Sequence, residues 1–250
     1  GTTAQAAINQ LGQQAGMPVD SIATLKTLTP GSGYMVNVRG YYTISDGGGG
    51  QFFGVTGAAA GTYVDDAGII ILPTGGDGSS AWIRLGYDLV DLLWKGDSLN
   101  VRWFGAKGDG IADDTVAVQQ AIDLGLSSAM SGTVYVPHGQ YNVSSINIYP
   151  LLPDKSLTIY GDGTQSAKFK KITGTSTPVF NISGIAIDPA GPGVTSKCQF
   201  RNFWIDGITD VVAKTSLHDG FYIDVLADFT IENVKISQCD TALNAKGALL

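Results

Sequence analysis

The stretch VRWFGAKGDGIADDTVAVQQ, residues 101–120, constrains the fold of this chain more than any other segment. Its first four residues, 101–104, include three apolar side chains and are typical of a strand. Three closely spaced glycines follow, at Gly105, Gly108 and Gly110, and they permit tight turns that other residues disfavour. Two adjacent aspartates and an Ala/Val/Gln-rich stretch come next. The segment therefore predicts a strand, a glycine-rich turn and a short helix in direct succession.

The helix is predicted to begin near Thr115. Asp113 and Asp114 occupy the positions at which an N-cap side chain and a negative charge in the first turn stabilise a helix. Apolar residues at helical spacing would give this helix one buried face, made by Val118, Ala121 and Ile122.

Composition favours an all-β chain with many turns. The sequence contains 34 glycines, and only 15% of its residues are charged, against about 25% in a typical globular protein. Of the 22 acidic residues only Glu232 is a glutamate. Aspartate is common in turns whereas glutamate favours helix interiors, so this imbalance also points away from helices.

Charge and motif content exclude several classes of function. A net charge of −7 disfavours a nucleic-acid-binding protein, which needs a basic surface to neutralise phosphates. The clustered lysines Lys168, Lys170 and Lys171 are interpreted as a small solvated face. The glycine spacing G-x-x-G-x-G matches neither the dinucleotide-binding fingerprint nor the P-loop. We therefore expect neither a nucleic-acid partner nor a nucleotide cofactor.

Cysteine usage and hydropathy add further expectations. Cys198 and Cys239 are expected to be free thiols, and no Cys/His spacing predicts a metal site. No apolar run approaches the ~20 residues that a bilayer crossing requires, and the N-terminus lacks a signal-peptide pattern. We expect no metal, no cofactor and no membrane insertion.

Three regions are predicted along the chain. Residues 1–30 form a helical leader or neck, within which Ser21 or Asp20 would cap a short helix. For its AQAAINQLGQQAG segment, a thin seam against partner helices and a frayed leader remain equal alternatives. Residues 31–98 form a small antiparallel β domain, since short β runs alternate with glycine clusters. Residues 99–250 hold the cap and first coils of a larger β structure.

The 101–120 stretch, together with GTVYVPHGQYNV at 132–143, resembles the N-terminal segment of the right-handed parallel β-helix in the pectate-lyase-like superfamily, in the form found in bacteriophage tailspikes. Residues 33–86 resemble the neck or particle-proximal domain of many tailspikes. The residues that carry the motif are Gly105, Gly108, Asp109, Gly110, Asp113, Asp114 and Thr115. The fold class that this resemblance implies is mainly β: a small N-terminal β-hairpin domain followed by the helix-capped start of a right-handed parallel β-helix.

The resemblance also implies a function. It implies a phage tailspike that recognises a bacterial surface polysaccharide, capsule or O-antigen, and in full-length form degrades it as a hydrolase or lyase. It implies a homotrimer in the virion tail that acts outside the host cell and joins other tail or baseplate proteins through its N-terminal region. Two alternatives stay open: a non-catalytic attachment and trimerisation segment of the tailspike, and a secreted pectinase-like enzyme. The active site of the whole protein is expected beyond residue 250.

A weak internal repeat supports stacked coils. With an offset of 31 residues, Phe200, Phe203 and Ile205 align with apolar residues, and Asn202 aligns with Asn233. Coils of a parallel β-helix would give this pattern, with apolar residues inside and polar ladders outside. The same overlay places Arg201 over Glu232, which we interpret as a surface ion pair.

Candidate site residues are few. A glycosidase needs two carboxylates at a defined separation, and Asp206, Asp219 and Asp224 are weak catalytic candidates. The first two precede glycines, where turn aspartates are common, whereas Asp224 lies within a β run. The aromatic residues Trp204 and Tyr222 are weak candidates for substrate binding, since outward-facing rings suit a glycan groove. The β-helix region contains no Asn-Thr-Asp triplet or Arg-x-Lys of the kind found in galacturonases.

Overall fold

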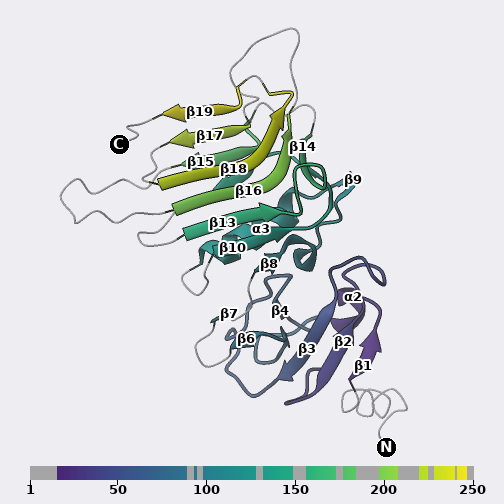
Figure 1. Ribbon diagram of the computed structural model, residues 1–250. Helices are drawn as coiled ribbons and strands as arrows, with labels where there is room; N and C mark the ends of the chain where they lie inside the picture. The colour runs from purple at the N-terminus through teal and green to yellow at the C-terminus, as the bar shows by residue number, and fades with distance from the viewer. Residues whose placement is uncertain are drawn as a thin grey trace, which may run out of the picture. The chain divides into compact units, whose positions relative to one another are not determined.

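The computed structural model describes residues 16–88, 93–94, 98–127, 132–148, 156–172, 177–183, 197–207, 220–224, 228–239 and 241–246. Of the helical leader predicted for residues 1–30, residues 1–15 lie outside these ranges. The chain divides into two compact units, one made of Gly1–Gly96 with Arg102–Gly105 and the other of Asp97–Val101 with Ala106–Leu250. Both are built mainly of strands (Figure 1).

The first unit is a small five-stranded sheet. In spatial order its strands are β1 (Met17–Val19), β2 (Met35–Val38), β3 (Gly50–Val55), β5 (Ala81–Arg84) and β4 (Ile70–Ile71). The pairs β2–β3, β3–β5 and β4–β5 are antiparallel, as predicted, but β1 pairs with β2 in parallel. A separate antiparallel pair joins β6 (Tyr87–Asp88) and β7 (Leu93–Trp94).

A short helix, α2 (Ile22–Leu25), follows β1 and completes the core of this unit. Ser21 caps it, as predicted, because its Oγ accepts a hydrogen bond from the backbone N–H of Thr24 over 3.2 Å. Ile22 and Leu25 face inward and pack in one cluster with Phe52, Trp82 and the buried side chains of β2.

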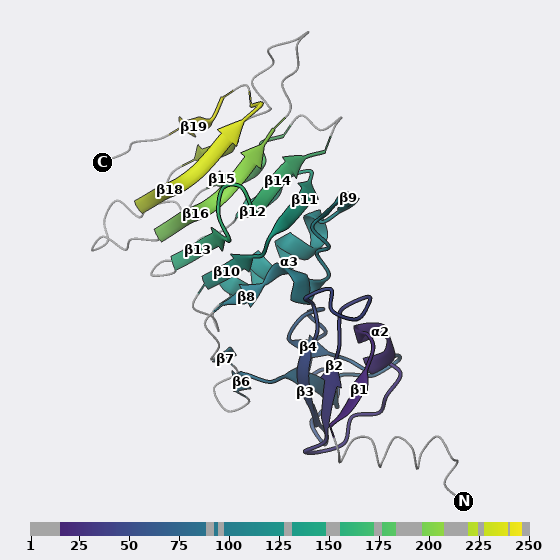
Figure 2. The same cartoon turned by 45° about the vertical axis from the view of Figure 1, so that its right-hand side comes forward.

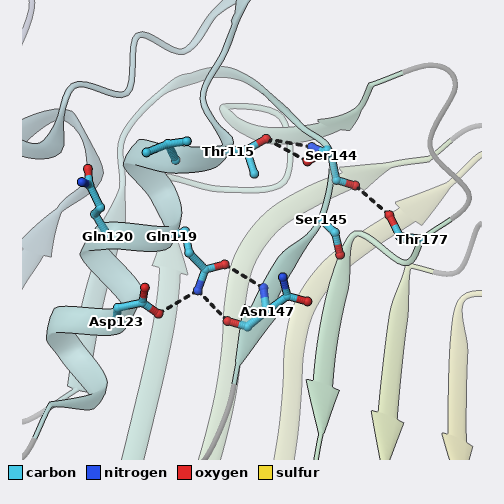
Figure 3. Close-up of a pocket in the computed structure, with 9 residues that line it drawn as sticks. Thr115, Gln119, Gln120, Asp123, Ser144, Ser145, Asn147 and Thr177 are labelled. Atoms are coloured by element: carbon cyan, nitrogen blue, oxygen red, sulfur yellow. Dashed lines mark hydrogen bonds between the residues drawn. The ribbon is translucent and has the colours of Figure 1, made fainter.

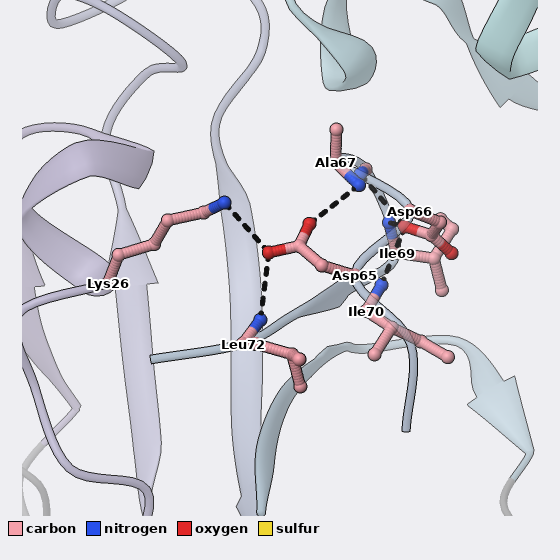
Figure 4. Close-up of polar contacts among 8 residues, drawn as sticks. Lys26, Asp65, Asp66, Ala67, Ile69, Ile70 and Leu72 are labelled. Atoms are coloured by element: carbon pink, nitrogen blue, oxygen red, sulfur yellow. Dashed lines mark hydrogen bonds and ion pairs between the residues drawn. The ribbon is translucent and has the colours of Figure 1, made fainter. Parts of the chain in front are cut away.

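Aspartates fix the turns of this unit by accepting backbone hydrogen bonds. Asp65 accepts from the N–H groups of Ala67 and Leu72 and pairs with Lys26 Nζ at 2.7 Å (Figure 4). Asp66 accepts from three successive N–H groups of the following turn. These contacts explain why a turn-rich chain uses aspartate in place of glutamate.

Asp46 shows the same device in the DGGGG cluster. Its carboxylate accepts from four backbone N–H groups, those of Tyr41, Tyr42, Thr43 and Gly48. Burial alone would raise the pKa of Asp46, but these four hydrogen bonds outweigh it and hold the pKa below its usual value.

The strand predicted at 101–104 is wrong: Val101–Phe104 is a 3-10 helix, η1. The N–H of Gly105 donates to the carbonyl of Arg102 over 3.2 Å and closes the turn. The Arg102 side chain donates from Nη1 to the carbonyl of Asp46 at 2.9 Å. A run of only four residues does not distinguish a strand from a tight helical turn, and here the following glycine, with φ of 96°, favours the turn.

The second unit is a parallel β-helix, which confirms the predicted fold class. The first sheet contains β8 (Leu99–Asn100), β10 (Gly132–Val136), β13 (Ser156–Gly161) and the first halves of β16 (Lys197–Asp206) and β18 (Asp228–Ser237). The second contains β9 (Asp109–Asp113), β11 (Gly139–Val143), β14 (Ala167–Lys171) and the second halves of β16 and β18. The third contains β12 (Ile146–Ile148), β15 (Phe180–Ser183), β17 (Phe221–Asp224) and β19 (Leu243–Lys246). Figure 2 shows these parallel strands stacked in order.

Apolar side chains from all three sheets fill the interior of the helix. The rings of Phe169, Phe180, Phe200, Phe203 and Phe221 are all fully buried, and neighbouring ring centroids lie 4.9–6.4 Å apart. The predicted 31-residue overlay is confirmed, because β16 and β18 pair Phe200 with Ile231 and Phe203 with Val234.

The helix predicted at Thr115 is confirmed as α3 (Thr115–Leu126). Its predicted apolar face, Val118, Ala121 and Ile122, is fully buried. The helix contacts β8, β10, β11 and β12, so it touches strands of all three sheets. It therefore covers one end of the stack and shields core side chains from water.

Of the two motif aspartates, only Asp113 binds the start of the helix through its side chain, and the acidic residue predicted for the first turn is absent. Asp113 Oδ1 accepts from the N–H and the hydroxyl of Thr115. Asp114, only 2% exposed, makes no cap bond and instead accepts from the N–H groups of Lys107 and Gly108, at 2.7 and 3.1 Å. Asp114 thus ties the glycine-rich turn to the start of the helix. Burial raises its pKa despite these two hydrogen bonds.

The remaining motif residues shape the turn itself. Gly108 has a φ of 63°, and a Cβ on it would lie 2.7 Å from the ring of Tyr141, so no larger residue fits. Asp109 accepts from the N–H groups of Ala112 and Ile111, and these bonds lower its pKa. The motif residues therefore act structurally, as a fixed lead-in to α3.

Candidate functional site

Two of the predicted site residues, Trp204 and Asp206, lie together on the outer face of the second sheet. Both belong to β16, in which the flanking Phe203 and Ile205 point inward and are fully buried. Since side chains alternate along a strand, Trp204 and Asp206 face outward on the same side. The sequence named both residues as candidates, and the structure adds that they lie on the same outer face.

Of the other candidates, only Tyr222 has a described side chain. Tyr222 is half-buried in β17 of the third sheet. Asp224 is the last residue of β17, and its side chain lies outside the described part of the chain, as does Asp219 altogether. A catalytic role for any of the three aspartates stays a prediction.

Asp206 is held by two neighbouring coils. Its Oδ2 lies 2.6 Å from Lys168 Nζ on β14, and its Oδ1 accepts from Ser237 Oγ on β18 over 2.9 Å. Although it points outward, these contacts leave the residue only 4% exposed. Both carboxylate oxygens already have partners, so Asp206 positions the side chains around it.

Trp204 sits between two lysines. It aligns with Lys168 on one side and Lys235 on the other, and their Nζ atoms lie 3.9 and 3.8 Å from its ring centroid. Its Nε1 donates to Ser237 Oγ over 2.7 Å. An ammonium group over an indole face is a favourable cation–π contact, worth about 0.5–2 kcal/mol.

The face carries more positive than negative charge. Lys168 is paired with Asp206, whereas Lys170 and Lys235 are exposed and form no ion pair with any residue that the structure describes. We call this set the lysine–tryptophan face; its members are Lys168, Lys170, Trp204, Asp206, Lys235 and Ser237. Sequence reasoning missed Lys235 and Ser237, because their neighbours come from other coils.

Lys171 corrects the interpretation of the lysine cluster as a solvated face. It is only 2% exposed, and its Nζ donates to the Ser144 carbonyl and, over 2.8 Å, to Thr177 Oγ1. Burial lowers the pKa of Lys171 to about 8. Alternation along β14 places Lys168 and Lys170 outside and Lys171 inside.

A separate open groove of about 710 Å³ lies beside α3 (Figure 3). Gln119 joins the helix to β12, since it donates to Asn147 O at 2.6 Å and accepts from Asn147 N at 2.8 Å. The same amide donates to Asp123 Oδ1 over 2.8 Å. The lining is mostly hydroxyl and amide groups: Thr115, Val116, Gln119, Gln120, Asp123, Ser144, Ser145, Asn147 and Thr177. Several of these polar groups form hydrogen bonds with one another. Asp123 is the one acidic residue of this lining, so the groove does not hold the two carboxylates that a glycosidase needs.

Across the described ranges, no group of three or more His, Cys, Asp or Glu side chains is placed to hold a metal ion. Cys198 is buried and Cys239 is half-buried, and neither forms a disulfide bond within the described part of the chain. No helix in these ranges combines the length and the apolar character that a membrane crossing requires.

Two family matches agree with the two units. Residues 18–87 match the phage tail protein small four-stranded β-sheet domain, and residues 98–203 match the family "Rhamnogalacturonase A/epimerase, pectate lyase-like". Among curated relatives, mannuronan C5-epimerase AlgE6 of Azotobacter vinelandii is 37% identical over 111 residues, 43% of this chain and 12% of that protein. Alginate lyase 7 of the same organism is 35% identical over 149 residues, 56% of this chain and 17% of that protein.

Solved structures share the fold. Tailspike protein 2 of the Escherichia coli O157:H7 bacteriophage CAB120 has a TM-score of 0.60 and 22% identity, over 93% of this chain and 29% of its own. A tailspike of the Acinetobacter baumannii bacteriophage Fri1, described as a capsular polysaccharide depolymerase, has a TM-score of 0.58 and 16% identity, over 88% of this chain and 38% of its own. The chain thus spans well under half the length of these proteins. Residues 18–87 are therefore similar to a phage-tail small β-sheet domain and residues 98–203 to a pectate-lyase-like domain, and the parallel β-helix is a fold that the chain shares with solved tailspikes.

Proposed function

We propose that this chain is part of a bacteriophage tailspike that recognises a bacterial surface polysaccharide and, within the whole protein, degrades it. The observation that carries the proposal is the presence of a phage-tail β-sheet domain and a pectate-lyase-like β-helix in one chain. The first is a domain of phage tail proteins, and the second is a fold shared with a capsular polysaccharide depolymerase. Relatives named for mannuronan and alginate agree with a polysaccharide as the substrate class.

Location and assembly follow from the same proposal. The tail-type domain at residues 18–87 would join the spike to other tail or baseplate proteins of the virion, and the β-helix would act outside the host cell. A homotrimer with side-by-side helices is part of this proposal. The lysine–tryptophan face is the surface of the described β-helix that we assign to polysaccharide contact, because it presents the exposed cations Lys170 and Lys235.

The test is binding of the 250-residue chain, carrying a fluorescent label, to encapsulated bacteria and to capsule-deficient mutants of the same strains. We expect binding to at least one encapsulated strain and its loss in the matched mutant. Equal binding to both members of every pair, or binding to none, contradicts the proposal. Gel filtration of the bound polysaccharide after incubation then reports whether this chain also shortens it.

An attachment segment without catalytic activity is the second candidate, and the match of residues 18–87 to a tail domain favours it. It predicts a trimer by sedimentation equilibrium but no shortening of any polysaccharide. A secreted pectinase-like enzyme, the third candidate, predicts a monomer that shortens a plant or bacterial polyuronate.

A further inference from the structure

We propose that the lysine–tryptophan face binds the carboxylate groups of an acidic polysaccharide through its lysine ammonium groups, and that Trp204 positions these groups instead of stacking on a sugar ring. The inference rests on the proposed function and narrows it to a substrate class. It assigns Lys235 as a binding residue and Trp204 as a positioning residue.

The surroundings of Trp204 leave no ring face for a sugar. Lys168 and Lys235 come from the strands on either side of β16, and each ammonium lies within 4 Å of the ring centroid. The indole N–H is already donated to Ser237. A sugar that stacked on this ring would have to displace one of the two cations, with the loss of a cation–π contact.

Two of the three lysines, by contrast, remain available to a ligand. Lys168 is fixed by Asp206 at 2.6 Å, whereas Lys170 and Lys235 are exposed and unpaired within the described chain. Three lysines face one aspartate, so this face is positive in a chain whose net charge is −7. Because both lysines over the ring are held by it, less side-chain entropy is lost when an anion binds.

Charge complementarity selects the ligand. Lysine ammonium groups act as point charges that bind carboxylates without a fixed fork geometry, which suits acid groups repeated along a flexible polymer. Lys168 and Lys235 belong to strands two coils apart, with Trp204 aligned between them, so their backbones lie about 9.6 Å apart along the stack and the face presents spaced cations. A neutral polysaccharide would leave these cations without partners.

The probes are a mannuronate oligomer and the mannose oligomer of the same length and linkage made by reducing its carboxyl groups. Calorimetry with the 250-residue chain should give at least tenfold tighter binding of the mannuronate oligomer, with affinity falling as salt rises from 50 to 200 mM. Equal affinities, or no binding of the acidic oligomer, overturn the inference. A chain that binds encapsulated cells yet fails here retains the proposed function and loses this one.

Variants separate charge recognition from stacking. Lys235→Gln should weaken binding of the acidic oligomer at least fivefold and reduce the salt dependence, whereas the exposed control Arg39→Gln in the first unit should leave both unchanged. Trp204→Phe should stay within twofold of the parent, since it keeps an aromatic face, and Trp204→Leu should lose at least fivefold. If Lys235→Gln binds as tightly as the parent or more tightly, the ring itself contacts the sugar and the inference is wrong.

Discussion

Asn233 Nδ2 donates a hydrogen bond to Asn202 Oδ1 over 3.0 Å, and the two residues occupy the same corner of successive coils. Both have left-handed backbone conformations, with φ of 51° and 60°. At this corner β16 ends its pairing with β13 and begins its pairing with β14. Asparagine tolerates this conformation better than other non-glycine residues, and its amide links the corners of neighbouring coils.

Replacing Asn202 should separate these two contributions. Asn202→Ala loses the amide contact and places a Cβ in the left-handed region, so we expect a destabilisation of about 1.5–3 kcal/mol. Asn202→Gly loses the amide but accepts the backbone conformation, and it should be about 1 kcal/mol more stable than the alanine variant. Urea unfolding measures both. An alanine variant as stable as the glycine variant would show that the corner relaxes to another conformation.

Asp114 is expected to be the most sensitive residue of the glycine-rich motif. Its buried carboxylate holds the N–H groups of Lys107 and Gly108, and an amide can accept only through its one oxygen. Asp114→Asn should therefore cost about 1–3 kcal/mol of unfolding free energy. The matched control is Asp113→Asn, since Asp113 is exposed. This substitution should lower the free energy of unfolding by less than about 1 kcal/mol. Thermal unfolding of both variants ranks them, and the reverse order would refute the division of roles.

The Arg201–Glu232 pair was predicted from the sequence overlay and is present, with Arg201 Nε 3.1 Å from Glu232 Oε2. The Arg201 Nε–H makes no hydrogen bond. The two charged groups are therefore close to each other, but they are not aligned for a hydrogen bond. Their side chains are 40% and 62% exposed, and exposed ion pairs contribute little. A double-mutant cycle with Arg201→Met and Glu232→Gln should give a coupling below about 0.5 kcal/mol at 150 mM salt. A coupling above about 1.5 kcal/mol would indicate a structural role.

Local and periodic signals explain which parts of the fold the sequence predicted. The helix at Thr115 follows from cap residues and an apolar face within one short segment, and the Phe200–Ile231 register follows from a repeat without insertions. The 3-10 turn at Val101–Phe104 was missed, since four residues are too few to show a helical or a strand-like periodicity.

The candidate site was only half predictable for a related reason. Trp204 and Asp206 were singled out by residue type, but their partners Lys168 and Ser237 come from different coils. The loops between successive strands differ in length. The number of residues that separates paired positions on β14 and β16 therefore differs from the number that separates paired positions on β16 and β18. When the strand register is unknown, a cluster of lysines in the sequence is easily interpreted as one solvated face. In the structure, alternation along β14 places Lys171 inside and Lys168 outside.

Lys171 gives a pH-dependent prediction. Burial lowers its pKa to about 8, whereas an unfolded lysine has a pKa near 10.4, so between these values the unfolded state binds more protons. The contribution of Lys171 to stability therefore rises with pH from about 8 to about 10.4 and is least favourable below pH 8. The variant Lys171→Met has no titrating group at this position and therefore lacks this pH-dependent contribution to stability. From urea unfolding at pH 7 and pH 9.5, the parent should gain on the order of 1 kcal/mol relative to the variant at the higher pH, because the other titrating groups cancel in the difference. An unchanged difference would mean that Lys171 keeps an ordinary pKa through its contacts with Ser144 and Thr177.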